Sequence, residues 1–379
     1  MRQVIRPPDL AILGSFHGVN TGDQSLGLSV KNCIKQSIYR SGFQNIFSLK
    51  NYPKCQLTIC AGGATGIESI VTELAKRNAD RPEMTALVGM NFADDVANFP
   101  ASTLEFLQQV SHISCRSKRQ VQQLAEILHK DDILYTPDNA FAYPFQSLSR
   151  GIDAHRQPKV LGFNVLNLFM TWVRGKGFVP GTPLADWYRS NNSDIISYID
   201  RIGPAYIKYF NSVISIYRAR GWEIVHIPFT PEDDLFAKTF FRSHQIKYHS
   251  FSPQPDVIFS HLQKCSLFIS TRFHALVFAL IANVPCVPVN YAIKCNDLLT
   301  DLNIDTALSI DRYQLVDSLD RSIAKTVCPQ PLLLSRSTLE LLRRKATSNI
   351  NSAFQSISQK QYISKLLINK NAVQLADFN

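Results

Sequence analysis

Short runs of apolar residues alternate along this chain with longer stretches in which apolar residues recur every three to four positions. The short runs predict buried strands, and the longer stretches predict amphipathic helices. In the first part of the chain the predicted strands cover residues 9–14, 57–61, 84–90, 112–115 and 132–135. The predicted helices extend from the first glycine-bearing loop to about residue 40, and then cover about 67–77 and 119–129. This alternation is typical of parallel α/β layers.

The same alternation starts again after a stretch rich in Ser, Gly, His and Pro, residues 147–158, which is typical of a linker. The predicted strands of the second series are 159–164, 222–227, 266–270 and 286–291, and the predicted helices are 194–220, 231–241, 256–263 and 271–282. From residue 335 to about 369 the pattern predicts one or two amphipathic helices.

These two series predict an α/β protein made of two Rossmann-like domains that face a cleft. The expected boundaries are 1–150 for the N-terminal domain, 151–330 for the C-terminal domain and 331–379 for a helical tail. Ligands of such sheets bind beyond the carboxyl ends of the strands. Polar residues that directly follow a predicted strand are therefore the first candidates for a functional site.

Composition narrows the class of protein. Of 379 residues 45% are hydrophobic and 18% charged, which is typical of a globular chain and excludes a disordered one. No apolar run approaches the ~20 residues of a membrane span, and the N-terminal residues lack the apolar stretch of a signal peptide. We therefore expect a cytoplasmic protein.

The chain is basic, with 40 Lys and Arg against 30 Asp and Glu, a net charge of +10. Such an excess favours anionic partners, among them phosphorylated substrates and anionic membrane surfaces. The densest basic clusters, 116–119 and 343–345, lack the interleaved aromatic residues of a single-strand binder, which argues against nucleic acid. The eight cysteines form no CxxC pair and no zinc-ligand spacing, so we expect free thiols and no metal.

The most informative stretch follows the predicted strand 266–270. Ser270 is expected to be the N-cap of the next helix, which places Arg272 and His274 in its first turn. Free backbone N–H groups and the helix dipole favour an anion there. An arginine can grip a carboxylate or phosphate at two points, and a histidine can transfer a proton. An ordinary helix start with a surface arginine and a packed histidine is an equally open interpretation.

A second candidate is the loop after the first strand, which contains His17, Gly18, Asn20, Gly22 and Asp23. Its glycines allow the backbone to approach a ligand, and its polar side chains can orient hydroxyls. The glycine spacing fits neither a phosphate-binding P-loop nor a dinucleotide fingerprint. Taken alone, the loop is better explained by Asp23 acting as the N-cap of the next helix.

Weaker candidates follow other predicted strands. Gly62 and Gly63 end the strand 57–61, and close packing explains them equally well. Lys294 lies beyond the strand 286–291, where the alternative is a solvated lysine. Asp138 after a proline is typical of a turn. We interpret His226 as a hydrogen-bonded histidine near the core rather than a ligand.

Taken in order, these segments resemble the polysaccharide pyruvyl transferase family. The matching pieces are Asn20-x-Gly22-Asp23, Gly62-Gly63, Arg116, Pro137-Asp138, Ile227-Pro228 with Glu232-Asp233, and Ser270-x-Arg272-x-His274 continued by Val284-Pro285 and Tyr291-x-x-Lys294. The chain departs from the family pattern at Ser117, where an acidic residue is common, and at Asn283, where glycine is usual.

The resemblance implies a GT-B-like fold and a phosphoenolpyruvate-dependent transferase. Its implied activity is transfer of a pyruvyl group to sugar hydroxyls of a cell-surface polysaccharide or its precursor, which forms a pyruvate ketal and releases phosphate. Family precedent places Arg272 and His274 at phosphoenolpyruvate, with no metal or organic cofactor. The implied acceptor is a glycan or a lipid-linked saccharide, and the positive charge suits a peripheral position at the inner face of a membrane.

The hypothesis assigns two roles in the reaction. His274 is the general acid, and Asp23 orients or deprotonates the acceptor from the other domain. The expected substrate-binding residues are Arg272, Phe273, Asn20, Gly22, Gly62, Gly63, Arg116 and Lys294.

Two alternatives remain. One is a glycosyltransferase that uses a nucleotide sugar, for which Asp297 is the candidate carboxylate for the ribose hydroxyls. The other is a non-catalytic member of the family that binds a glycan.

Overall fold

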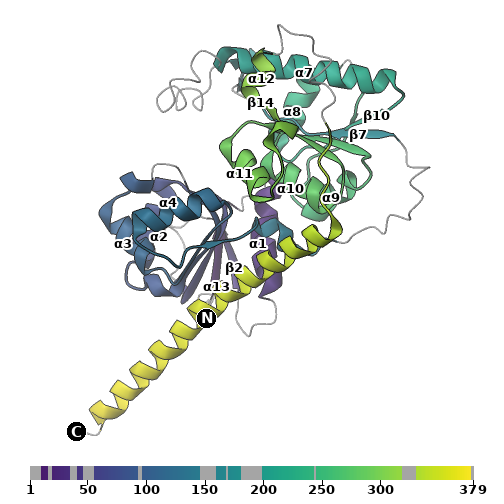
Figure 1. Ribbon diagram of the computed structural model, residues 1–379. Helices are drawn as coiled ribbons and strands as arrows, with labels where there is room; N and C mark the ends of the chain where they lie inside the picture. The colour runs from purple at the N-terminus through teal and green to yellow at the C-terminus, as the bar shows by residue number, and fades with distance from the viewer. Residues whose placement is uncertain are drawn as a thin grey trace, which may run out of the picture. The chain divides into compact units, whose positions relative to one another are not determined.

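The computed structural model describes residues 10–15, 19–34, 41–45, 55–92, 96–145, 159–167, 170–180, 199–242, 245–317 and 330–376. These residues form two compact units (Figure 1). The first unit contains Met1–Gly18, Asp23–Pro144 and Ser337–Asn379, and the second contains Val19–Gly22 and Phe145–Arg336. Each unit is described by itself below.

The first unit is built on a parallel sheet of six strands in the order β2-β1-β3-β4-β5-β6. The strands are β1 (Leu10–Gly14), β2 (Ser41–Asn45), β3 (Leu57–Gly66), β4 (Thr85–Phe92), β5 (His112–Cys115) and β6 (Leu134–Tyr135). β1 is buried at every position, which explains why its sequence is a continuous apolar run rather than an alternating one. The strand order reverses between β1 and β3, the point at which parallel sheets of this type usually bind a ligand.

Helices cover both faces of this sheet. The helices are α1 (Thr21–Cys33), α2 (Glu68–Asn78), α3 (Ala101–Gln109), α4 (Lys118–Leu128) and α13 (Arg336–Ala376). α2, α3 and α4 contribute to one apolar core with the sheet, and α1 and α13 lie on the opposite face (Figure 1).

The helical tail expected at the C-terminus is the single long helix α13, and from Ser337 it belongs to the first unit. Its buried residues recur at helical spacing: Leu342, Ala346, Ile350, Ala353 and Ile357. Asn349 lies on the same helix and ties it to β5, because its Nδ2 donates to Ser114 Oγ (3.0 Å) and its Oδ1 pairs with His112 Nε2 (3.1 Å). The tail is therefore an integral layer of the first unit.

The second unit has a parallel sheet in the order β11-β10-β7-β12-β13-β14. Its strands are β7 (Val160–Phe163), β10 (Glu223–His226), β11 (Lys247–Tyr248), β12 (Leu267–Ser270), β13 (Cys286–Asn290) and β14 (Ile310–Asp311). Numbered within the unit, this order is 3-2-1-4-5-6, that of a Rossmann fold. The order reverses between β7 and β12, so a ligand crevice is expected at the carboxyl ends of these two strands.

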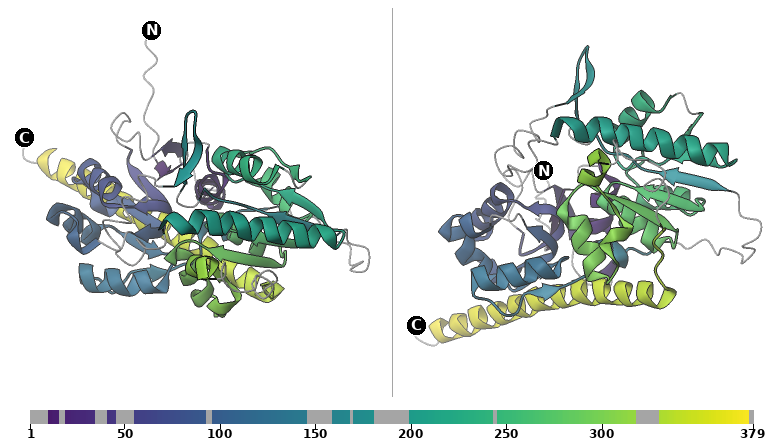
Figure 2. Two further views of the ribbon diagram at one scale, coloured as in Figure 1. Left: turned by 90° about the horizontal axis from the view of Figure 1, so that it is seen from above. Right: turned by 45° about the horizontal axis from the view of Figure 1, so that its top comes forward.

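The helices of the second unit form two layers around its sheet (Figures 1 and 2). α7, α8 and α12 cover one face, and α9, α10 and α11 cover the other. Their bounds are α7 (Ile199–Ala219), α8 (Pro231–Phe240), α9 (Pro255–Leu262), α10 (Phe273–Ile281), α11 (Ile293–Asp301) and α12 (Arg312–Asp317). An antiparallel hairpin, β8 (Met170–Val173) with β9 (Gly177–Pro180), is inserted between β7 and α7.

The expected fold class is confirmed: the protein is α/β with parallel sheets in two Rossmann-like units, the components of a GT-B-like protein. The prediction that Gly62 and Gly63 end a strand is wrong, since β3 continues to Gly66. Both glycines have positive φ, 61° and 76°, and the pairing with β4 shifts register between Gly63 and Gly66. A sequence pattern cannot distinguish such an irregularity from a strand end, because glycine is typical of both.

The state of the cysteines agrees with the sequence. The seven cysteines in the described part of the chain are free thiols, and all but Cys33 are buried. None of the described helices combines the length and the apolar character needed to span a membrane.

His226 ends β10 and lies in the core of the second unit, with no exposed surface. Its ring contacts those of Phe163 and Tyr248, at centroid distances of 5.1 and 5.9 Å. The core location agrees with the sequence interpretation, but the expected hydrogen bonds are absent, because neither ring nitrogen has a partner among the described residues. Burial, assisted by Lys238 and His249, lowers the pKa of His226 to about 3. The ring is therefore neutral in the folded protein at neutral pH.

This burial predicts a specific loss of stability in acid. Between the unfolded pKa of about 6.5 and the folded pKa of about 3, the histidine binds a proton in the unfolded chain but not in the folded one. The free energy of unfolding therefore decreases as pH falls, by about 1 kcal/mol per pH unit. We expect His226→Leu to flatten the dependence of unfolding free energy on pH from 6.5 to 5, measured by urea unfolding. His129→Asn, at an exposed histidine with a left-handed backbone that suits asparagine, is the control. Equal slopes in wild type and His226→Leu would contradict the assignment.

Candidate functional site

The candidate site of the second unit lies where β7 and β12 end side by side. Asn164 follows β7, and Thr271 and Arg272 follow β12. The Asn164 side chain joins the two strand ends, because its Oδ1 accepts the backbone N–H of Arg272 (3.0 Å). This is the reversal point of the strand order, where a Rossmann-like sheet binds its ligands.

α10 starts later than the sequence predicts. Its N-cap is Arg272, with extended backbone angles (φ −71°, ψ 141°), so the expectation that Ser270 caps the helix and Arg272 lies in the first turn is wrong. Ser270 Oγ instead donates to the carbonyl of Arg272 (3.1 Å). Thr271 is held outside the helix by bonds to Tyr206 Oη (2.7 Å) and to the carbonyl of Asn164 (3.2 Å). His274 does lie in the first turn, and no side chain caps that helix end.

The guanidinium of Arg272 is largely committed to Asp233 of α8. Its Nε donates to both carboxylate oxygens (2.7 Å each), and its Nη2 lies 2.6 Å from Oδ1. Nη2 also donates to Thr230 Oγ1 (2.9 Å). Burial acts to lower the pKa of Arg272, but the charge and hydrogen bonds of Asp233 hold it above the usual value. The two-point grip expected for a ligand is therefore occupied, and Nη1 is the nitrogen that makes no hydrogen bond within the described residues.

Lys294, in the first turn of α11, is the second cation of this group. Its Nζ lies 5.1 Å from the ring centroid of Tyr291 and 6.0 Å from that of Phe273. Such distances are typical of cation–π contacts. No carboxylate of the described chain pairs with Lys294, so its charge is not offset as that of Arg272 is. Phe273 itself is buried and supports both Lys294 and the His274 ring, whose centroid lies 5.4 Å away.

The short segment of residues 19–22 belongs to the second unit and reaches the same site. Thr21 anchors it, with its N–H donating to the carbonyl of Phe229 (3.1 Å) and its hydroxyl to that of Ser252 (2.6 Å). Gly22 then lies directly against the side chain of His274, since a Cβ at position 22 would overlap the Cβ of His274 and the Cγ and Nδ1 atoms of its ring. Close approach is therefore the reason for glycine at this position.

The capping role in this loop belongs to Asn20 and not to Asp23. Asn20 Oδ1 accepts the N–H of Gly22 (2.9 Å), which is the bond of an N-cap, and Asp23 lies inside the first turn of α1. His17 and Gly18 lie outside the described residues.

Asp23, Gly62 and Gly63 lie in the first unit. A Cβ at Gly63 would stand 3.5 Å from Asp23 Oδ1, and one at Gly62 would stand 2.7 Å from the carbonyl oxygen of Gly89. The glycine pair therefore allows close packing between β3, β4 and the start of α1. This is the ordinary explanation that the sequence left open.

Arg116 follows β5 in the first unit, where it forms a buried ion pair. Its Nη1 lies 2.7 Å from Asp138 Oδ2, with side-chain exposures of 4% and 1%. Asp138 also accepts the N–H of Ala140 (2.9 Å), so it both stabilises a turn, as expected, and holds the arginine. Ser117, at the departure from the family pattern, is the N-cap of α4, its Oγ accepting from the N–H of Gln120.

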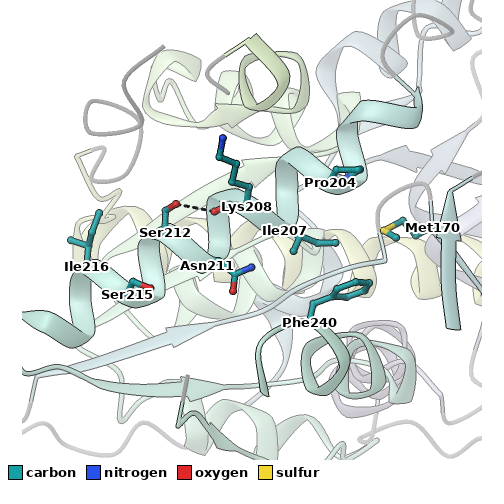
Figure 3. Close-up of a pocket in the computed structure, with 9 residues that line it drawn as sticks. All are labelled: Met170, Pro204, Ile207, Lys208, Asn211, Ser212, Ser215, Ile216 and Phe240. Carbon is teal, nitrogen blue, oxygen red and sulfur yellow. Dashed lines mark hydrogen bonds between the residues drawn. The ribbon is translucent and has the colours of Figure 1, made fainter. Parts of the chain in front are cut away.

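An open apolar groove of about 870 Å³ lies elsewhere in the second unit, along α7 (Figure 3). It is lined by Met170, Pro204, Ile207, Lys208, Asn211, Ser212, Ser215, Ile216 and Phe240. None of the predicted site residues lines it. Within the described part of the chain, no three His, Cys, Asp or Glu side chains are grouped so as to hold a metal ion.

Sequence reasoning assigned no role to Asn164, Tyr206, Thr230 or Tyr291. For Asn164 a signal existed, because it is a polar residue directly after a buried apolar strand. The others come from separate elements, and only the tertiary structure brings them to Arg272.

Comparison with protein families gives one match. Residues 100–292, more than half of the 379 residues, match a family model described as polysaccharide pyruvyl transferase. The matched segment contains Arg116, Asp233, Arg272 and His274, but ends just before Lys294. No curated protein sequence matches the chain.

Several solved structures resemble the chain in fold. A UDP-N-acetylglucosamine 2-epimerase described as putative, from Listeria monocytogenes, is 11% identical over 94% of this chain and 98% of that one, with a TM-score of 0.48. A UDP-GlcNAc 2-epimerase from Neisseria meningitidis bound to UDP-GlcNAc is 7% identical over 92% and 99%, with a TM-score of 0.48. A heptosyltransferase from E. coli with ADP is 11% identical over 84% and 99%, with a TM-score of 0.39. These likenesses concern the fold alone.

The buried ion pair of Arg116 yields a stability prediction. Arg116→Ala leaves the Asp138 carboxylate buried without its cation, and we expect it to lower the unfolding free energy by about 3–5 kcal/mol in urea titrations. Arg116→Met combined with Asp138→Asn should recover much of this loss, because no unpaired charge remains. Asp132→Ala, which breaks an ion pair whose carboxylate is 68% exposed, is the control, with an expected change below about 1 kcal/mol. A loss in Arg116→Ala as small as in this control would contradict a structural role.

The contact between Gly22 and His274 yields a second prediction. Gly22→Ala introduces a methyl group into the space of the imidazole, and we expect a destabilisation of about 1–3 kcal/mol from overpacking. His274→Gly removes both the ring and the Cβ that the methyl group would overlap. The double variant should therefore lose less stability than the sum of the two single losses, a coupling that thermal unfolding measures. Strictly additive effects would show that the two residues do not touch.

Proposed function

Because the chain belongs to the polysaccharide pyruvyl transferase family, we propose that it transfers a pyruvyl group from phosphoenolpyruvate to two hydroxyls of a sugar in a cell-surface polysaccharide or its precursor. The observation that carries this proposal is the group formed by Arg272, His274 and Lys294 around the start of α10. It combines two cations and a proton carrier at the reversal point of a Rossmann sheet, where an anionic ligand is expected.

Phosphoenolpyruvate carries two anionic groups, a carboxylate and a phosphate, and the site offers donors of different character. In this proposal Arg272 contributes Nη1 as a directed donor, since its other nitrogens bind Asp233 and Thr230. Lys294 contributes a charge that no carboxylate of the described chain offsets, and the uncapped helix end adds backbone donors. Lys294 is therefore assigned the larger part of the electrostatic attraction, and Arg272 the larger part of the orientation.

The reaction needs one proton donor and one acceptor of a hydroxyl proton. A sugar hydroxyl adds to C2 of phosphoenolpyruvate, and C3 gains a proton to become a methyl group. The C2–oxygen bond to the phosphate then breaks, and a second hydroxyl adds to C2 to close the ketal. The two hydroxyl protons end on C3 and on the released phosphate. His274 is assigned the role of general acid, positioned by Gly22 on one side and Phe273 on the other.

The remaining assignments concern the acceptor. Asp23 is proposed as the group that orients or deprotonates the attacking hydroxyl, and the backbone of Gly62 and Gly63, next to it, is proposed to contact the sugar. Arg116 is better assigned to support of its own unit through Asp138 than to direct contact with a substrate. The acceptor is a glycan or a lipid-linked saccharide, and the net charge of +10 favours a peripheral position at an anionic membrane face.

The test is phosphate release from phosphoenolpyruvate in the presence of galactose-, mannose- and glucosamine-containing acceptors. We expect His274→Gln to lower kcat by about 10²- to 10⁴-fold, the usual contribution of a general acid. Lys294→Met should raise KM for phosphoenolpyruvate by about 10- to 100-fold, as expected for loss of a charged contact. Lys208→Met, at a lysine of the separate α7 groove, is the matched control and should leave both constants unchanged.

The same samples separate the alternatives by calorimetry. Binding of phosphoenolpyruvate without turnover would mean that the acceptor panel lacks the right sugar. Binding of a uridine or adenosine nucleotide in place of phosphoenolpyruvate would refute pyruvyl transfer and favour a nucleotide sugar as donor. Binding of a glycan with neither donor would favour a non-catalytic role.

A further inference from the structure

Asp233 is the most heavily hydrogen-bonded side chain of the candidate site, although the reaction as proposed does not use it. It is fully buried in the first turn of α8. Its Oδ2 accepts from the N–H groups of Phe229 (2.9 Å) and Thr230 (3.1 Å) and from Asn164 Nδ2 (3.1 Å). Both of its oxygens accept from Arg272. The bonds to Phe229, Thr230 and Asn164 therefore fix the orientation of the carboxylate independently of Arg272.

The arginine is held from its backbone as well. Asn164 accepts the Arg272 N–H with Oδ1 and donates to Asp233 with Nδ2, so one side chain links the start of α10 to the partner of the guanidinium. Asn164 is itself fully buried. Both ends of the Arg272 side chain are thus attached to one polar network that leaves it little freedom of rotation. Its side chain is 16% exposed.

This network has two opposite effects on an anion at the site. It directs Nη1 of Arg272 to one place, which favours a defined pose of the ligand. It also places a full negative charge within 2.7 Å of the guanidinium, which weakens the attraction for any anion, substrate and phosphate product alike. A free arginine would bind anions more tightly and in more orientations.

We infer that Asp233 is a positioning residue of the transfer reaction, which orients Arg272 toward the donor and, by offsetting its charge, prevents tight retention of the phosphate product. This inference rests on the proposed function. It predicts that affinity for anions and rate of turnover change in opposite directions when the carboxylate is neutralised, a result that simple damage to the fold does not produce.

The primary test compares Asp233→Asn with wild type in the phosphate-release assay. We expect kcat to fall by about tenfold or more, while KM for phosphoenolpyruvate and the inhibition constant of inorganic phosphate both decrease by about threefold or more. Asp234→Asn is the matched control, since Asp234 lies beside Asp233 in the same helical turn but pairs with Lys238. It should leave all three constants unchanged.

The path through Arg272 is tested by a double-mutant cycle. If Asp233 acts through the guanidinium, Asp233→Asn should have little further effect on kcat or on the phosphate constant in an Arg272→Met background, which lacks the charge as well as the donors. If Asp233 matters only as a cap of α8, its effect should be the same in both backgrounds, which would overturn the inference.

Thr230→Val provides a second variant in case Asp233→Asn does not fold. It removes an acceptor of Arg272 Nη2 and keeps the buried carboxylate, with Thr230→Ser as the control that retains the hydroxyl. We expect kcat to fall in the valine variant while the phosphate constant stays near that of wild type, because orientation is lost and charge is not. Wild-type kcat in the valine variant would overturn the positioning role.

Failure of the proposed function gives a different result from failure of this inference. If wild type binds phosphate but not phosphoenolpyruvate in calorimetry, the proposed function fails, and the role of Asp233 is judged by whether Asp233→Asn binds phosphate more tightly. If turnover is observed and Asp233→Asn shows an unchanged or weaker phosphate constant, the inference alone fails. If wild type binds neither anion, both are wrong.

Discussion

The second unit depends on one buried ion pair, between Asp233 at the start of α8 and Arg272 at the start of α10. These residues lie 39 positions apart in the chain and come from helices on opposite faces of the sheet. Removing Arg272 would leave the fully buried carboxylate of Asp233 without its cation, which is costly in free energy. Asn164 completes the link by bonding to both residues from the end of β7. The three strand and helix ends that surround the candidate site are thereby held as one arrangement.

The same ion pair changes the role that the motif Ser270-x-Arg272-x-His274 suggests for its arginine. An arginine near a helix N-terminus suggests a strong anion grip, yet the structure shows that most of its donors serve Asp233. In the proposed function the charge that attracts an anionic donor is therefore assigned to Lys294, which lies near the rings of Tyr291 and Phe273. The proposed site therefore separates two tasks. An arginine whose charge is offset by Asp233 orients the ligand, and a lysine without a carboxylate partner in the described chain attracts it.

Much of the candidate site could be predicted from the sequence because the residues concerned follow strands. Parallel strands deliver the residues at their carboxyl ends to one edge of the sheet, so Arg272 and His274 were identifiable from their place after an apolar run. The start of α10 could not be predicted, since Thr271 is kept out of the helix by Tyr206, a residue from another layer. The sequence allowed both Asn20 and Asp23 as the cap and favoured Asp23, because asparagine and aspartate are both good caps and only the local geometry chooses between them.

The sequence by itself determined the α/β class, the two series of strands and helices, and the position of the arginine and histidine at a strand end, because burial imposes a local period on each element. Only the tertiary structure decided what those side chains do. It paired Arg272 with Asp233 and Arg116 with Asp138, and it placed Gly22 against His274. Such pairings join residues far apart in the chain, so no local pattern encodes them. They depend on the order of the strands and on the close packing of helices against the sheet, which are properties of the folded molecule as a whole.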